Sequence, residues 1–265
     1  MSSEHLSNVR RLRPVVHTIT NYVTANDCAN LLLAAGASPI MADAPEEASQ
    51  IAAIADAVVL NLGTLNSYRR EAIRIAGKTA HTAGKPVVMD PVGVGASDFR
   101  RDAAQMLLNE AKPTVIRGNR SEIRALLTGE TGERGVDTAD LHDAGEETAQ
   151  LLAKQTGAVV LQTGETDLVT DGEQMIRIHG GSSMLCLVTG AGCMLSALTG
   201  AFLAANPEQP LQAAASAAET MSVCAEIAQR RLRTGEYLEL NSTYQIILKH
   251  SMTIDWLLSQ DSLLL

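Results

Sequence analysis

The sequence predicts an α/β fold with a central, mostly parallel sheet flanked by helices. Apolar runs of strand length alternate with amphipathic segments of helix length, the order expected when helices connect parallel strands. The strand segments are rich in β-branched residues and show little apolar/polar alternation, as expected of strands buried on both faces. No flexible linker, charge block or internal repeat divides the chain, so we expect residues 1–265 to form a single domain without a separate lid.

The alternation begins with a strand in "PVVHTIT" and a helix that ends at Gly36, because glycine accepts the left-handed conformation that often ends a helix. The same order then repeats along the chain. The expected strands are 14–20, 38–41, 57–63, 86–91, 114–119 and 158–164, and the expected helices are 24–36, 45–55, 67–84, 100–111, 121–127 and 138–157.

After Thr163 the pattern changes. Residues 166–181 predict a β-hairpin that turns at Asp171-Gly172, since Asp-Gly favours a tight two-residue turn. The last third of the sequence is largely helical in pattern. Helices are expected over 194–205, 211–233 and 242–260.

The charge and cysteine content exclude several classes of function. With 21 basic and 30 acidic residues the formal net charge is −9, which disfavours binding to nucleic acids or to anionic membranes. The N-terminus lacks the apolar core of a signal peptide, and no apolar run reaches the length of about 18 residues that a membrane span needs. The four cysteines form no C-x-x-C pair, so we expect reduced thiols and a cytoplasmic protein.

Polar residues end several of the predicted strands. Because ligands bind beyond the carboxyl ends of parallel strands, these residues are candidates for a site. Each also has a structural alternative, since such residues end strands and cap helices. The residues are Thr20, Asn21, Asn61, Gly63, Asp90, Arg117, Asn119, Thr163 and Glu165.

Four of these positions suggest phosphate and metal chemistry. Asp90 in "VVMDPV" could bind Mg²⁺, or could form a turn before proline. Glu122 could hold a water on the same ion, or could complete a capping box with Asn119. Arg117 ends an apolar run, where a charge needs an anion such as a nucleotide phosphate, and Thr163 could donate a hydroxyl to a phosphate or cap its strand.

A glycine-rich turn in "VTGAGCMLSA" precedes the predicted helix 194–205. Backbone N–H groups at a helix N-terminus bind anions, and Gly190 and Gly192 would let a phosphate approach closely. The alternative is that the glycines serve only tight packing of a buried helix. The turn does not match the P-loop pattern, because no Lys-Ser/Thr pair follows it.

These motifs together resemble the ribokinase-like superfamily of small-molecule kinases. Most members have aspartate after the G-x-G, as the base for the acceptor hydroxyl, where this chain has Cys193. That cysteine, with "TNYVTANDCANLLLAAGASPIMADAPEEAS", "LNLGTL", "MDPVGVGAS", "IRGNRSEI" and "TGETD", is similar to the hydroxyethylthiazole kinases of thiamine salvage. The resemblance runs from about residue 15 to about residue 203.

The resemblance implies phosphorylation of the alcohol of 4-methyl-5-(2-hydroxyethyl)thiazole by ATP with Mg²⁺, in a homotrimer with active sites between subunits. It implies that residues 190–193, which are Gly190, Ala191, Gly192 and Cys193, form the catalytic loop. By matched position ATP would contact Arg117, Thr163 and Asn119, Mg²⁺ would contact Asp90 and Glu122, and the thiazole would contact Met41, Gly190, Asn21, Val23 and Gly63. Met41 could instead fill a gap in the core.

The chain departs from the resemblance at Leu187, where the family often has lysine, so nucleotide affinity or choice could differ. A helix N-terminus would lower the pKa of the Cys193 thiol from about 8.5, which makes it a possible but not a required base. Two other interpretations stay open. The acceptor could be a hydroxymethylpyrimidine or a sugar, or the protein could bind its ligand without catalysis.

Overall fold

One eight-stranded sheet runs through the structure, a computed structural model that describes residues 2–129 and 144–233. Its strand order is β2-β1-β3-β4-β5-β6-β7-β8, with parallel pairing up to β6 and antiparallel pairing from β6 to β8. The strands are β1 Val15–Ile19, β2 Ser38–Ile40, β3 Ala57–Asn61, β4 Val87–Asp90, β5 Val115–Asn119, β6 Val159–Thr163, β7 Asp167–Thr170 and β8 Met175–Ile178.

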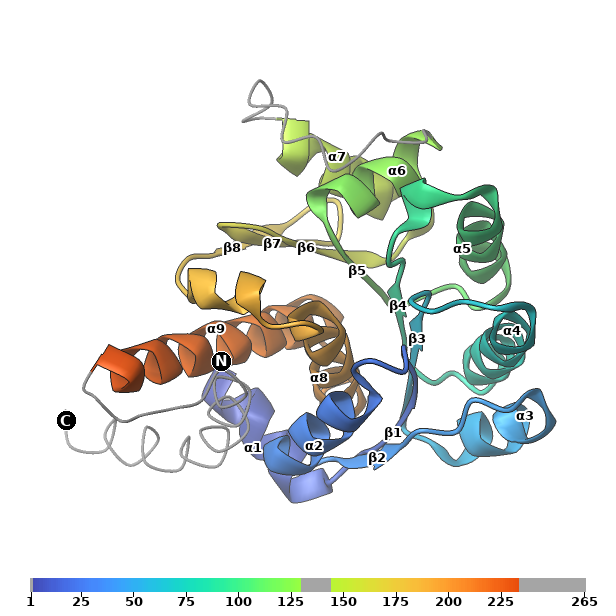
Figure 1. The fold of residues 1–265 in the computed structure, drawn as a ribbon, viewed down its shortest axis with the longest axis horizontal. Coiled ribbons are helices and arrows are strands. Elements are labelled where there is room, and N and C mark those ends of the chain that lie inside the picture. The colour runs from blue at the N-terminus through green and yellow to red at the C-terminus, as the bar shows by residue number, and fades with distance from the viewer. Residues whose placement is uncertain (1, 130–143, 234–265) are drawn as a thin grey trace.

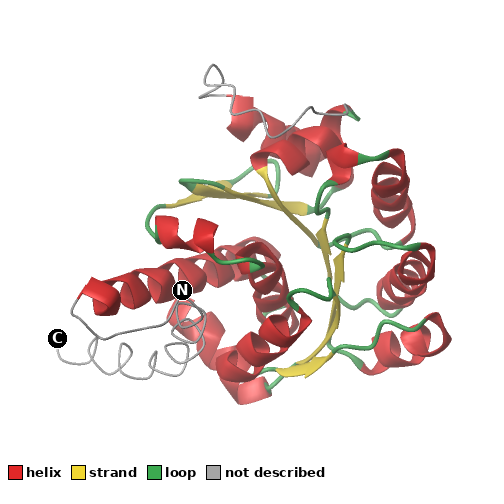
Figure 2. Cartoon of the chain, viewed as in Figure 1, coloured by secondary structure: helices red, strands yellow, loops and turns green. Residues whose placement is uncertain are grey.

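Helices cover both faces of this curved sheet (Figures 1 and 2). The concave face holds α1 Ser2–Leu12, α2 Ala25–Ala35, α8 Ala191–Ala205 and α9 Pro210–Arg233. The other face holds α3 Pro45–Ile54, α4 Ser67–Thr82, α5 Asp98–Glu110, α6 Arg120–Thr128 and α7 Ala144–Thr156. Short 3₁₀ turns span η1 Val94–Ala96 and η2 Ser183–Leu187.

The strands are apolar throughout because both faces are covered. In β3, Val59 joins the core under α8, while its neighbours Val58 and Leu60 join the core under α4 and α5. Successive side chains of a strand point to opposite faces, so a continuous apolar run supplies both cores. This explains why the strand segments lack the alternation of a half-exposed sheet.

Helix α8 packs closely on the centre of the sheet. Twelve of its 15 residues are buried. At Gly200 a Cβ would lie 2.6 Å from Cγ2 of Val59 and 3.2 Å from Cγ1 of Val16, so only glycine fits this contact. The N-terminus of α8 is thereby brought down to the carboxyl ends of β3 and β4, with which the helix is in contact.

The predicted α/β fold and the β-hairpin are confirmed, but the predicted two-residue turn is wrong: Thr170 pairs with Met175, so residues 171–174 form a four-residue loop. β7 and β8 pair in antiparallel fashion across Gly172, whose φ is +96°, and Asp171 accepts bonds from the amides of Glu173 and Gln174. Helix α1 was not predicted. Its buried apolar residues, Leu6 and Val9, are too few to produce a strong pattern in isolation.

Parts of two predicted helices fall outside the described residues. Of the predicted helix 138–157, residues 144–156 form α7, and the predicted helix 242–260 lies wholly beyond residue 233. No helix in the described part of the chain combines the length and the apolar character that a membrane crossing needs.

The contact at Gly200 leads to a stability prediction. Gly200→Val should lower the free energy of unfolding by about 1–3 kcal/mol, because the added carbons overlap Val59 and Val16. The control is Ala204→Val on the same helix, at a half-buried position, which should cost only the lower helix propensity of valine. Urea unfolding of both variants measures the difference, and equal losses of stability would contradict the close-packing argument.

Candidate active site

The carboxyl ends of the parallel strands gather polar side chains at one edge of the sheet. Asn61 at the end of β3 pairs in register with Asp90 at the end of β4. Asn119 at the end of β5 pairs with Thr163 at the end of β6. Helix α8 begins next to this edge, so strand ends and a helix N-terminus share one location.

Asp90 is the most buried charged group there. Its side chain is fully buried, and its Oδ2 accepts bonds from Asn61 Nδ2 at 2.8 Å and Ser196 Oγ at 2.7 Å. A nitrogen of Arg117 lies 3.7 Å from the same oxygen. Burial raises the pKa of Asp90 to about 6, against the opposing effect of Arg117. Its Oδ1 is buried without a hydrogen-bond partner, which leaves one oxygen for a cation or a donor.

Cys193 lies beside Asp90 in the first turn of α8. Its sulfur accepts hydrogen bonds from the side-chain amides of Asn21 at 3.0 Å and Asn61 at 3.3 Å. The expectation that the helix N-terminus lowers the pKa of this thiol is wrong. The side chain is only 8% exposed, and burial, reinforced by the charge of Asp90, raises the pKa. The thiol is therefore neutral at pH 7.

The glycine turn before α8 can bind an anion. Gly190 occupies the N-cap with φ +85°, and no side chain caps the helix. A Cβ at Gly190 would lie 2.0 Å from Cγ2 of Thr24, and a Cβ at Gly192 would lie 2.3 Å from Nη1 of Arg117. The Arg117 guanidinium thus lies directly against the backbone of the first turn of α8. Its charge and the positive end of the helix dipole therefore act at the same place.

Arg117 is held by Thr163 and by its ion pair with Asp90, but one of its nitrogens has no partner. Its Nη2 donates to Thr163 Oγ1 at 2.9 Å, and its Nε is buried without a hydrogen-bond partner. A buried cation that retains a free donor beside a helix N-terminus is well placed to receive a phosphate group. Asp167 at the start of β7 lies close enough to feel the Arg117 charge, although burial still raises the pKa of this aspartate.

Asn119 and Glu122 form the capping box of α6. The Asn119 side chain accepts from the Glu122 amide at 2.9 Å, and Glu122 Oε2 accepts from the Asn119 amide at 2.9 Å. Glu122 Oε1 also accepts from the amide of Gly93 at 3.0 Å. Both carboxylate oxygens are therefore engaged, although Glu122 is near enough to Asp90 to raise its pKa.

The structure divides the predicted thiazole-binding residues into two groups. Asn21 and Gly63 lie together, because a Cβ at Gly63 would be 3.1 Å from Cβ of Asn21. Met41, by contrast, is half-buried and packs against the core under α8. The side chain of Val23 is 67% exposed in this chain.

Sequence reasoning missed Ser196 and Thr24, and it named Asn61 only as one of the strand-end candidates, without a specific role. Asn61 donates to both Asp90 and Cys193, Ser196 donates to Asp90, and Thr24 donates to Asn21. Asn61 ends a predicted strand, so its position was a usable signal. Ser196, one turn after Gly192, is one of two hydroxyl residues, with Thr199, in an otherwise apolar stretch, which is also a signal in retrospect.

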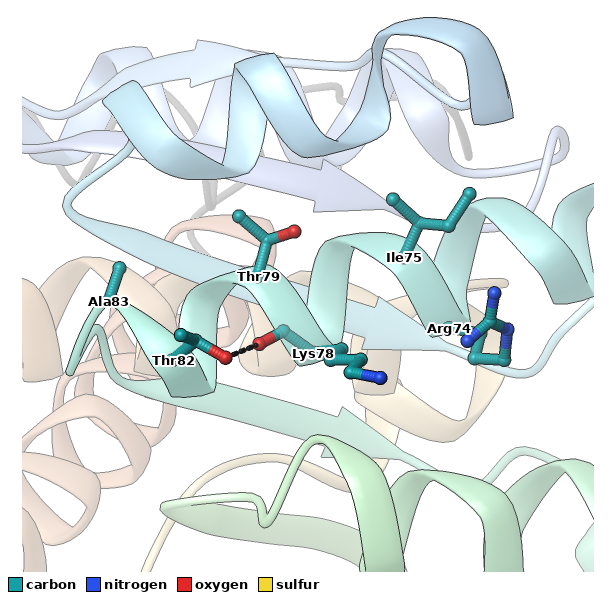
Figure 3. Close-up of a pocket in the computed structure, with 6 residues that line it drawn as sticks. All are labelled: Arg74, Ile75, Lys78, Thr79, Thr82 and Ala83. Atoms are coloured by element: carbon teal, nitrogen blue, oxygen red, sulfur yellow. Dashed lines mark hydrogen bonds between the residues drawn. The ribbon is translucent and has the colours of Figure 1, made fainter.

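A shallow pocket elsewhere on the molecule is not this site. It lies along α4 on the convex side and is lined by Arg74, Ile75, Lys78, Thr79, Thr82 and Ala83 (Figure 3). Its lining includes none of the polar residues at the carboxyl edge. Its wide opening and long side chains suit exposed helix surface rather than a small-molecule site.

A divalent cation at the carboxyl edge would have few protein ligands. The described residues contain no group of three or more His, Cys, Asp or Glu side chains suited to a metal. Mg²⁺ needs only one or two carboxylates when substrate phosphates and water complete its shell. The unpartnered Oδ1 of Asp90 fits that requirement. Each Glu122 carboxylate oxygen accepts one backbone hydrogen bond, and its second lone pair can accept a hydrogen bond from a metal-bound water.

Comparison with known proteins shows the family to which the chain belongs. Residues 6–249 match the profile of the Hydroxyethylthiazole kinase family. The hydroxyethylthiazole kinase of Clostridium acetobutylicum is 45% identical over 240 residues, which cover 88% of each chain. The solved structure of a hydroxyethylthiazole kinase from Pyrococcus horikoshii superposes with a TM-score of 0.84 at 37% identity, covering 95% of this chain and 92% of that one.

A solved structure of much lower sequence identity has the same fold. A ribokinase-like superfamily protein from Enterococcus faecalis superposes with a TM-score of 0.58 at 14% identity, covering 94% of this chain and 88% of that one, a likeness that concerns the fold alone. The fold is therefore ribokinase-like. Because the family profile spans most of the sequence and the relatives are well above 30% identical, the chain belongs to the hydroxyethylthiazole kinase family.

Proposed function

We propose that the carboxyl edge around Asp90, Arg117 and the α8 N-terminus is where this kinase transfers the γ-phosphate of ATP to the hydroxyl of 4-methyl-5-(2-hydroxyethyl)thiazole. One observation carries the proposal. The Arg117 guanidinium lies against the backbone of Gly192 at the start of α8, with a buried nitrogen left unpartnered. A moving phosphoryl group needs such a preformed positive site, because catalysis of phosphoryl transfer is mostly positioning and charge stabilisation.

On the nucleotide side, Arg117 and Thr163 hold phosphate oxygens, and the amides of residues 190–193 surround the transferred group. Asn119 supports this side mainly by fixing α6, since its side-chain oxygen is used in the capping box. Asp90 and a water on Glu122 would hold Mg²⁺, which shields phosphate charge when bound. Hydrogen bonds from Asn61 and Ser196 hold the Asp90 carboxylate in position to bind the ion.

On the acceptor side, Asn21, Gly63, Gly190 and Cys193 surround the alcohol, with Met41 and Val23 as further contacts. Cys193 positions the hydroxyl rather than acting as its base, because the raised pKa keeps the thiol neutral. In a loose transition state the hydroxyl loses its proton late, so a strong base is not required. A hydroxymethylpyrimidine or a sugar offered as a competing acceptor tests the choice of alcohol.

The direct test is ATP-dependent turnover of the hydroxyethylthiazole with Mg²⁺ present. Asp90→Asn should lower turnover by about 10²-fold or more, because the charge that organises the phosphate side is lost. The variant should fold as well as the wild type. The raised pKa of Asp90 shows that burying its charge is unfavourable, and the neutral asparagine side chain avoids that cost. Thermal unfolding checks the fold, and absence of turnover by the folded wild type would contradict the proposed function.

Cys193 variants test its role. Cys193→Ala should lower kcat/KM by about fivefold, as expected for lost contacts worth about 1 kcal/mol, and therefore by less than Asp90→Asn. Cys193→Ser should stay closer to the wild type, because its oxygen can accept the same amide hydrogen bonds. If Cys193→Ala removed all activity while Asp90→Asn kept it, this ranking would be wrong.

We further propose a homotrimer with active sites between subunits, in a cytoplasmic setting that suits the four free cysteines. The exposure of Val23 beside the acceptor group supports this, because a neighbouring subunit would cover it. Light scattering should give the mass of three chains of 28.1 kDa each. Full activity at the mass of one chain would contradict the shared sites.

A further inference from the structure

Arg69, in the first turn of α4, is the largest side chain that the described part of the molecule buries completely. Only 1% of it is exposed. Burial lowers the pKa of its guanidinium, and its Nε has no hydrogen-bond partner. A cation at this end of a helix also opposes the helix dipole. The location is unfavourable for a charge on three counts, so stability alone is a poor reason for an arginine here.

The guanidinium contacts three loops that are far apart in the sequence. It stacks under the ring of Tyr22, 4.5 Å from the centroid. Its Nη1 donates to Thr64 Oγ1 at 2.7 Å, and its Nε lies 3.5 Å from Oδ2 of Asp43. These residues follow β1, β2 and β3, the three strands at one side of the carboxyl edge.

Each of the three loops carries a residue of the proposed acceptor pocket. Tyr22 lies next to Asn21, whose amide binds the Cys193 sulfur. Thr64 follows Gly63 and has a φ of +48°, a strained value for a β-branched residue, which its hydrogen bond to Arg69 helps to hold. Asp43 follows Met41 by two residues. One buried cation therefore joins the three segments that surround the alcohol.

The ring of Tyr22 also separates this cation from solvent. The ring is 65% exposed while the guanidinium beneath it is 1% exposed. A planar guanidinium can stack on a ring and donate in its plane at the same time, which a lysine ammonium cannot do. The arrangement thus specifies arginine rather than positive charge alone.

We infer that Arg69 is a positioning residue for the acceptor pocket: by joining the loops after β1, β2 and β3, it sets the shape of the pocket that receives the thiazole alcohol. This inference rests on the proposed function. A positioning role predicts that loss of Arg69 weakens acceptor binding and leaves nucleotide binding unchanged, whereas a general structural role would affect both. The reason is that Arg117 and Thr163 come from β5 and β6, on the far side of Asp90.

The test compares Arg69→Met with Arg74→Met, an arginine on the same helix that pairs with Glu71 and Glu110 and lines the outer pocket of Figure 3. Arg69→Met should raise KM for the thiazole alcohol by about tenfold or more, with KM for ATP within about twofold of the wild type. Titration calorimetry with the thiazole alcohol alone should show the same loss of affinity. Arg74→Met should change neither constant.

A second pair of variants covers the case in which Arg69→Met fails to fold. Thr64 is exposed, so Thr64→Ala and Thr64→Ser should both fold. The serine variant keeps the hydroxyl that Arg69 binds and should retain the wild-type KM for the alcohol, whereas the alanine variant should raise it. Tyr22→Phe should behave as the wild type and Tyr22→Leu should not, because only phenylalanine keeps the ring.

The outcomes separate this inference from the proposed function. A wild-type protein that turns over the thiazole alcohol, with an unchanged alcohol KM in folded Arg69→Met, would overturn the inference alone. A parallel rise of both KM values, or a loss of the oligomer seen by light scattering, would also overturn it in favour of a general structural role. A folded wild type without turnover of the alcohol would refute the proposed function itself.

Discussion

The carboxyl edge of the sheet depends on the complete burial of one carboxylate, Asp90. A charge without access to water must be satisfied by its neighbours, and Asn61, Ser196 and Arg117 meet that need from β3, α8 and β5. These partners fix the relative positions of three elements. The cost of burial is visible in the raised pKa of Asp90, and the remaining free oxygen is what makes the arrangement useful for catalysis.

Helix α8 connects the core to this edge. Its close approach to the sheet at Gly200 places its first turn over the strand ends. There the side chains of Thr24 and Arg117 pack against Gly190 and Gly192, closer than a residue with a Cβ would allow. The same helix thus buries a large apolar surface and directs its positive end at the site. The position of α8 on the sheet therefore accounts both for the packing of the core and for the proposed anion site.

Cys193 lies where the two halves of the site meet. Its sulfur accepts hydrogen bonds from Asn21 on the acceptor side and from Asn61, which also binds Asp90 on the phosphate side. A neutral thiol adds no second negative charge next to Asp90, whereas an aspartate there would place two buried carboxylates side by side. Arg69 extends the acceptor side further, through loops that Cys193 does not reach.

The sequence by itself determined the α/β class, the hairpin and the candidates Asp90, Arg117 and Gly190–Gly192, because apolar periodicity, turn residues and strand-end positions are local properties. The capping box of Asn119 and Glu122 was equally readable, since its two members are only three positions apart. The raised pKa of Cys193, the bonds of Asn61 and Ser196, and the buried Arg69 cluster were decided by the tertiary structure. Burial and charge at these positions depend on which distant elements pack together, and no local pattern carries that information.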